Sequence, residues 1–109
     1  MELTFNIVVE KKEGVHVATC LEMGLVATAD NEQDLPAIMD KLIHRQIAFA
    51  IENENFQDIF HPADPKIWHR LSDAFMKEKA RAIRKSEERM TTKKWQGFAV
   101  TQTAYAIAC

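Results

Sequence analysis

Three short strand-like runs open the chain, and apolar and polar residues alternate in the first two. Residues 3–9 place Phe5 and Ile7 on one face, residues 15–21 continue in the same way after a short turn, and residues 24–29 are mostly small and apolar. A period of two residues predicts strands, and short links between strands predict an antiparallel meander. The apolar face of such a meander needs another element to cover it.

After residue 30 the apolar residues recur at intervals of three and four, which is the spacing of a helix. These positions are Leu35, Ile38, Met39, Leu42, Ile43, Ile47, Ala50 and Ile51. Asp30 or Asn31 is suited to cap this helix, because either side chain can accept hydrogen bonds from first-turn N–H groups. Pro36 is tolerated because it lies near the first turn. The sequence therefore predicts one long helix, ending at residues 52–55, that covers the sheet.

The second half of the chain is less regular. Residues 56–60 form a short apolar piece, which is either a fourth strand at a sheet edge or a loop packed on the body. Asp64 and Pro65 are typical of a helix start, and the second helix is predicted to run to about Met90. Residues 95–109 are uncharged. They either add a strand to an exposed edge, including that of a second subunit, or remain disordered.

These patterns predict an α/β fold of the α+β type. We expect a three- to four-stranded antiparallel sheet packed by one long helix, with an appended basic helix and a neutral C-terminal tail. The corresponding divisions are a core at 1–61, a basic helical extension at 62–94 and an apolar tail at 95–109. The apolar content of 47%, with only 3 Gly and 3 Pro, is that of an ordinary globular chain.

Charge divides the chain more sharply than its net value of −2 suggests. Residues 1–65 hold four Lys and Arg against twelve Asp and Glu, a net charge of −8. Residues 66–94 hold ten Lys and Arg against four Asp and Glu, a net charge of +6. An acidic body and a basic segment can each attract a partner of opposite charge.

The first half of the chain resembles the HicB antitoxin family, one half of a bacterial toxin–antitoxin pair. The run FNIVVEKKEG at 5–14 looks like that family's opening strand and charged hairpin, VHVATCLEMG at 15–24 like its second strand and turn, and VATADNEQDL at 26–35 like its third strand and acidic helix start. The resemblance implies a truncated ribonuclease-H-like sandwich without the nuclease carboxylates. It also implies an acidic face that covers a small basic, RNA-binding toxin.

Two departures from the family bear on function. The family's proline-containing turn is replaced by residues 22–24, and its Gly-Asp-Thr corner by residues 29–31. The family usually carries a small DNA-binding module after this core, whereas here one basic helix and a neutral tail are predicted. Operator binding is therefore less well supported than the fold.

Two sets of charged residues are candidate binding sites. The partner-protein set is Glu10, Glu13, Glu22, Asp30 and Glu32, and the nucleic-acid or acidic-partner set is Lys77, Arg81, Arg84, Lys85 and Arg89. The acidic set can instead be helix capping and ordinary surface charge. The basic set can instead be a solvated helix with internal ion pairs, or it can dock on the acidic half of this chain or of a neighbouring copy.

No motif in the sequence specifies catalysis, a metal or a cofactor. Glu10, Asp30 and Asp64 can be imagined as the metal-binding carboxylates of a small nuclease, but their spacing fixes no such geometry. The four histidines lack metal-ligand spacing, and Cys20 reads as a buried thiol in a strand.

We therefore expect a non-catalytic, cytoplasmic, antitoxin-like or regulatory protein without a membrane span. It is expected to bind a toxin-like small basic protein and, through residues 77–94, nucleic acid. We also expect a homo-oligomer. The alternatives are a homo-oligomeric structural protein without a nucleic-acid role, and the small nuclease.

Overall fold

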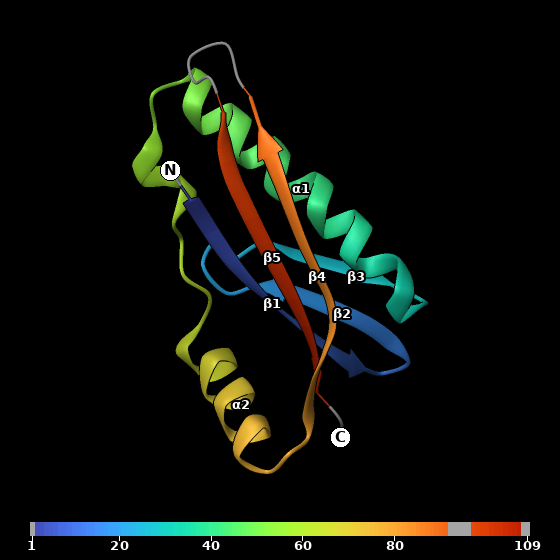
Figure 1. The fold of residues 1–109 in the computed structure, drawn as a ribbon. Helices are drawn as coiled ribbons and strands as arrows, with labels where there is room; N and C mark the ends of the chain where they lie inside the picture. Colours follow the sequence, from blue (N-terminus) through green and yellow to red (C-terminus); the bar gives the residue numbers. More distant parts are fainter. Residues whose placement is uncertain (1, 92–96, 108–109) are drawn as a thin grey trace.

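The computed structural model describes residues 2–91 and 97–107, and over these it is an α+β fold with a five-stranded sheet and two α-helices (Figure 1). The elements in chain order are β1 (Glu2–Lys12), β2 (Val15–Cys20), β3 (Val26–Ala29), the 3-10 turn η1 (Glu32–Asp34), α1 (Leu35–Glu52), the 3-10 turn η2 (Phe56–Ile59), α2 (Pro65–Met76), β4 (Ala80–Met90) and β5 (Phe98–Ile107).

The strands lie in the order β3-β2-β1-β5-β4. The first three form the predicted antiparallel meander, with Ile7 opposite Cys20 and Ala18 opposite Ala27. β5 pairs parallel to β1, and β4 pairs antiparallel to β5. The sheet is therefore mixed and has five strands, so the prediction of three to four antiparallel strands is wrong in both respects.

The two helices contact opposite faces of the sheet. Successive residues of a strand point to opposite sides, and on β1 Ile7 packs in the core cluster that contains the buried side of α1, whereas Val8 packs against Leu71 of α2. Six of the eight positions in the predicted apolar stripe of α1 are buried, whereas Leu42 is half-buried and Ile38 is exposed. With Pro36, the buried residues of α1 are Leu35, Pro36, Met39, Ile43, Ile47, Ala50 and Ile51. We call the face covered by α1 the inner face and the other the outer face.

The predicted basic helix over residues 77–90 is wrong. α2 ends at Met76, after which Glu78 adopts a left-handed φ of 57° and the Lys79 N–H donates to the Ala74 carbonyl at 2.7 Å. Residues 80–90 then pair with β5 as an edge strand. Their sequence is rich in Ala, Arg, Lys and Glu, which favour helices in isolation, but pairing with a neighbouring strand overrides that preference.

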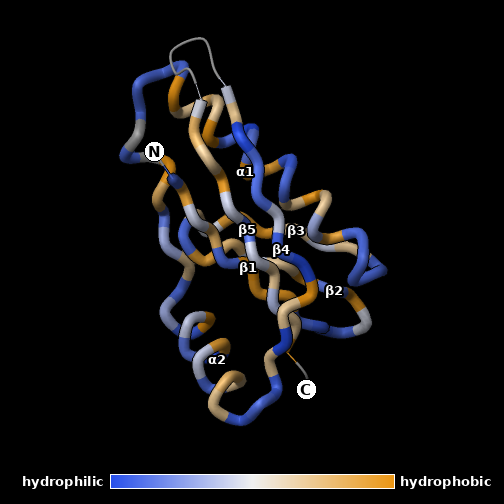
Figure 2. Tube along the Cα trace, viewed as in Figure 1, coloured by the Kyte–Doolittle hydropathy of each residue, from blue (hydrophilic) through white to orange (hydrophobic). Residues whose placement is uncertain are grey.

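The tail adds a strand, as one of the two predicted alternatives has it, but Phe98–Ile107 is the inner strand β5 between β1 and β4 and not an edge strand. The middle of β4 is hydrophilic beside the neutral to hydrophobic β5 (Figure 2). An uncharged strand suits this position, because both of its faces are largely covered. Residues 95–96 and 108–109 of the predicted tail lie outside the described residues. Residues 56–60 are not a strand, since they hold η2, where Ile59 is buried against the core.

The segment that connects α1 to α2 passes the start of β1 (Figure 1) and contacts the β2–β3 turn. The Ala63 N–H donates to the Leu21 carbonyl at 2.8 Å. Gly24 has a φ of +70°, and a Cβ added there would lie 2.6 Å from the His61 carbonyl oxygen. Only glycine fits this turn without moving the connector that carries α2.

Candidate functional site

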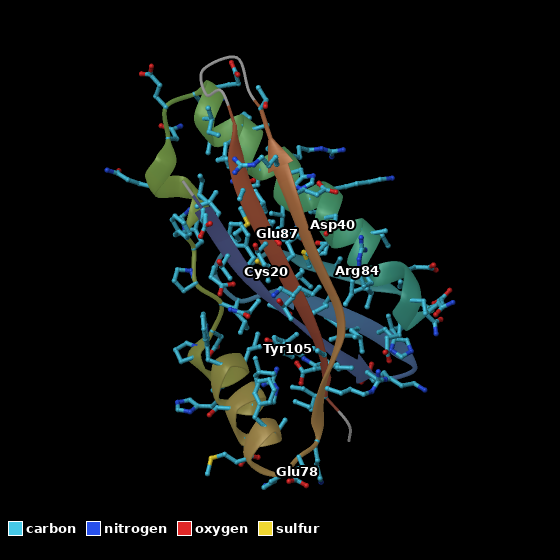
Figure 3. All side chains as sticks on the ribbon, viewed as in Figure 1. Cys20, Asp40, Glu78, Arg84, Glu87 and Tyr105 are labelled. Atoms are coloured by element: carbon cyan, nitrogen blue, oxygen red, sulfur yellow. The ribbon has the colours of Figure 1, made fainter. Side chains whose placement is uncertain are left out.

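Two of the five predicted nucleic-acid-binding cations face the protein's own acidic residues. Arg81 Nη2 lies 3.1 Å from Glu32 Oε1, and Arg84 Nη2 lies 2.9 Å from Asp40 Oδ2. A register shift after Ala82 turns both arginines toward the inner face, although their positions differ by an odd number. Figure 3 shows Arg84 and Asp40 side by side between β4 and α1. This agrees with docking on the chain's own acidic half for these two residues.

A third contact, which is an ion pair only when His44 is protonated, extends this line toward the end of β4. His44 Nε2 lies 3.2 Å from Glu88 Oε2. We call the three contacts the charged seam, which consists of Glu32, Asp40, His44, Arg81, Arg84 and Glu88. Its residues come from η1 and α1 on one side and from β4 on the other. The charged seam connects the edge strand β4 to η1 and to the long helix α1.

Burial changes the acidity of the seam's central carboxyl group. Partial burial raises the pKa of Asp40 above its ordinary value of 3.8, and the nearby charges of Arg84 and His44 act in the opposite direction. Gln102 lies behind it, with a buried Oε1 that has no hydrogen-bond partner in the described part of the chain. The adjoining cavity of about 10 Å³ is the size of one water molecule, so it is too small for an organic ligand.

The other three predicted cations lie elsewhere. Lys77 pairs with Asp73 one helical turn away, at 3.1 Å. Lys85 and Arg89 are exposed on the outer face of β4, opposite Thr103 and Ala99, and among the described residues they have no ion pair. The structure therefore does not bring the five cations together as one basic surface.

Besides Glu32, two further members of the acidic set have partners within the fold. Glu10 accepts two hydrogen bonds from Arg70 of α2, at 2.8 and 2.9 Å, so this pair ties α2 to the central strand. Glu22 accepts from the Asn6 backbone N–H and side-chain amide, both at 2.8 Å. These carboxylates have structural roles that the sequence did not reveal.

Glu13 and Asp30 are the exposed members of the acidic set, and they lie at the same end of the sheet. Glu13 is in the β1–β2 turn, and Asp30 directly follows β3. Because His16 pairs with Ala29, the turn and the end of β3 are neighbours. We call this region the acidic end. Glu22 lies in the β2–β3 turn at the other end of β2, apart from it.

A hollow of about 270 Å³ lies beside the acidic end, where the parallel strands β1 and β5 finish. Its lining is Val9, Glu10, Lys11, His16, Glu32, Arg81, Ala106 and Ile107. The two carboxylates in this lining already bind Arg70 and Arg81. No group of three potential metal ligands occurs among the described residues.

Two of the three carboxylates considered as nuclease metal ligands have other partners within the fold, whereas Asp30 is exposed at the end of β3. Asp64 caps α2, since its Oδ1 accepts from the Lys66 N–H at 2.9 Å. Glu10 binds Arg70. Cys20 is buried in β2, as predicted, and burial raises the pKa of its thiol to about 12. A thiol in this environment is a poor nucleophile.

α2 presents a feature that sequence reasoning missed. Trp68, Phe75 and Met76 are 39%, 47% and 83% exposed. Phe75 follows the buried Ala74, and its ring meets Tyr105 edge-on, with the centroids 5.1 Å apart. Trp68, seven residues earlier, lies on the same side of the helix. In the sequence, Trp68 directly follows the apolar Ile67, and this was the available signal.

The comparisons with known proteins give no relative for this chain. No protein-family model, curated protein or solved structure matches it. The resemblance to HicB antitoxins therefore stays a prediction. Within the described residues, no helix is long and apolar enough to cross a membrane.

Proposed function

We propose that this chain is a non-catalytic, cytoplasmic regulatory protein that acts by binding a partner protein, in the manner of a HicB-like antitoxin. The observation that carries the proposal is the exposed apolar side of α2. Large apolar groups at a surface favour contact with another macromolecule, and Trp is the residue most enriched at the energetic centres of protein interfaces.

The position of α2 also suits a binding role. The helix is fixed to the body by Leu71 and Ala74 underneath and by the Arg70–Glu10 pair at its side. Trp68 is therefore held in place before a partner arrives. A preformed contact helix loses less conformational entropy on binding than a free segment would.

The net charge of −8 over residues 1–65 favours a basic partner, although the exposed Lys11 and Lys12 lie directly beside Glu13. The acidic end offers Glu13 and Asp30 without ion pairs in the described part of the chain. Complementary charge speeds and orients the encounter, whereas buried aromatic groups supply most of the affinity. A small basic protein, as the resemblance implies, fits this combination.

The test is affinity capture from the source cell with matched variants. The full chain is expected to recover one small basic protein in stoichiometric amount. The double variant Trp68→Ala/Phe75→Ala should lose at least about 2 kcal/mol of binding free energy, roughly a 30-fold loss of affinity, measured by calorimetry on the purified pair. Phe49→Ala is the control, because Phe49 is 61% exposed on α1, on the opposite face of the sheet.

Two results would contradict the proposal. One is recovery of nothing but the protein itself. The other is an α2 double variant that binds the recovered partner as tightly as the Phe49→Ala control.

Nucleic-acid binding is a second candidate, supported by Lys85 and Arg89 on one exposed face of β4. Cations four residues apart on a strand lie about 13 Å apart, so each can contact a separate phosphate of one backbone, and each contact would add about 0.9 to the log–log salt slope. A salt-dependent gel shift with Lys85→Glu/Arg89→Glu tests this. An unchanged shift in the variant excludes these residues as the contacts.

A further inference from the structure

β4 leaves one side of the sheet open. It is the last strand in the order β3-β2-β1-β5-β4, and at eleven residues it is much longer than the four-residue edge strand β3. In the described part of the chain no strand pairs with its outer side. The backbone N–H and C=O groups on that side are a template for another strand.

The charges along β4 are complementary to a reversed copy of the same strand. In an antiparallel pair of identical strands with Ser86 opposite Ser86, Lys85 lies opposite Glu87 of the second copy. In the same register Arg84 lies opposite Glu88 of the second copy. The two-fold symmetry repeats both contacts, so four opposite-charge pairs flank the axis without a like-charge pair.

Neighbouring registers lack this match. A pair centred on Lys85 places that lysine against itself. A pair centred on Glu87 places Glu87 against itself and Lys85 against Arg89. Like charges directly opposite each other across two strands are unfavourable, and opposite charges are favourable. The sequence of β4 therefore selects the register centred on Ser86.

We propose that two copies of this protein associate by pairing their β4 edges antiparallel about a two-fold axis at Ser86, which joins the two sheets into one. The inference goes beyond the proposed partner binding, because it concerns β4 and not α2. Symmetry requires both copies to use the same surface, and the charge sequence meets that requirement.

The side chains of β4 are available for this pairing. Lys85 and Glu87 are exposed on the outer face, and among the described residues neither has an ion pair. Arg84 and Glu88 face α1 and are also exposed, although they contact Asp40 and His44. Pairing Arg84 with Glu88 of the second copy would connect the charged seams of the two subunits.

Charge on an edge strand also limits unwanted association. Charged side chains on an exposed edge oppose pairing with strands in general. The charges of β4 are complementary to those of its own reversed copy. The same residues therefore oppose pairing with other strands and permit pairing with a second copy of β4. The register shift after Ala82 limits the regular pairing to residues 84–88.

The first test is charge reversal with rescue, read by sedimentation over a concentration series. Lys85→Glu and Glu87→Lys should each weaken the dimer at least about tenfold, since each turns two opposite-charge pairs into like-charge pairs. Lys85→Glu/Glu87→Lys in one chain should restore it. An equimolar mixture of the two single variants should form a heterodimer. Lys66→Glu, an equal charge change on α2, is the control.

The second test is disulfide cross-linking in a Cys109→Ser background. Ser86→Cys should cross-link its own copy under mild oxidation, because the two-fold axis places residue 86 opposite itself. Glu87→Cys should not, because its copy lies two residues along the paired strand, beyond the roughly 7 Å Cα separation that a disulfide spans.

Dimerisation of the wild type, loss in each single charge variant and rescue in the mixture are the expected results. The proposal is overturned if the wild type stays monomeric throughout the concentration series, or if the single variants associate as the wild type does. Failure of the mixture to recover the dimer, or equal cross-linking at residues 86 and 87, overturns it as well.

Discussion

The two helices cover the two faces of one sheet very differently. α1 buries seven of its eighteen residues against the inner face. α2 buries Leu71 and Ala74 among its twelve residues, while Trp68, Phe75 and Met76 remain exposed. The inner face therefore holds the fold together, whereas the outer face keeps apolar groups available. This contrast places the stability of the protein on α1 and its proposed contacts on α2.

The strongest challenge to this contrast is removal of a core side chain from each helix. Ile43 is fully buried in α1, and Ile43→Ala should lower the free energy of unfolding by about 2–5 kcal/mol. Leu71→Ala should fall at the lower end of that range, because Leu71 is 8% exposed and belongs to a smaller buried cluster. Urea denaturation of both variants gives the comparison.

Lys41→Ala serves as the control for those measurements, since Lys41 is exposed on α1 and should change stability by less than about 0.5 kcal/mol. A larger loss in Leu71→Ala than in Ile43→Ala would reverse the assignment of the two faces.

A smaller effect is expected where the connector to α2 touches the β2–β3 turn. Gly24→Ala should cost about 2 kcal/mol, from the positive φ and from the contact with the His61 carbonyl. Gly14→Ala is a matched control, because Gly14 has a φ of +82° but nothing within 4 Å of the added Cβ.

Thermal and urea unfolding give the loss of unfolding free energy in each glycine variant. Both variants strain the backbone, so the difference between their losses measures the contact between residue 24 and the His61 carbonyl. Gly24→Ala should also weaken partner binding by loosening α2. Equal losses of stability in the two variants would show that the His61 contact contributes nothing.

The first half of the fold could be predicted because its local and long-range signals agree. Phe5 and Ile7 alternate along the face of β1 that packs against α1, and the stripe of α1 keeps helical spacing along its length. Asn31 was a predicted cap, and its side chain accepts from the Gln33 N–H at the start of η1. In this half of the chain, the spacing of the apolar residues in the sequence matches the positions that are buried in the structure.

The strand β4 could not be predicted from its own sequence, because its conformation depends on pairing with β5. Arg81 and Arg84 face inward yet are charged, so no apolar alternation marks the strand. The register shift after Ala82 further disrupts the period of two. The inner-face ion pairs depend on η1 and α1, more than forty residues earlier, and a local pattern does not reveal them. The predicted basic residues of β4 lie on two faces for the same reason. Arg81 and Arg84 face inward to their ion pairs, whereas Lys85 and Arg89 are exposed on the outer face.

The start of each helix offers a finer comparison. Asp64 caps α2 with a hydrogen bond from its side chain to the Lys66 N–H, whereas Asp34 at the start of α1 makes no such bond. Asp64→Ala should therefore cost about 1 kcal/mol, and Asp34→Ala clearly less. Circular dichroism during urea unfolding measures both. If Asp34→Ala proved the more damaging, α1 would depend on its first turn more than on its packing.

The smallest effect concerns the acidity of Asp40, where α1 meets β4. Burial raises the pKa of this carboxyl above 3.8 in the folded protein, so the folded state keeps a proton that the unfolded state has already released. As the pH rises from 3.8 through the raised pKa, this group should lower the free energy of unfolding. Asp40→Asn lacks the titration. The wild type minus variant difference, from urea unfolding at a series of pH values, should therefore fall through that window and be level on either side. A difference that rises with pH would mean that the Arg84 ion pair outweighs burial, and that the charged seam stabilises the edge strand more strongly than its partly buried position suggests.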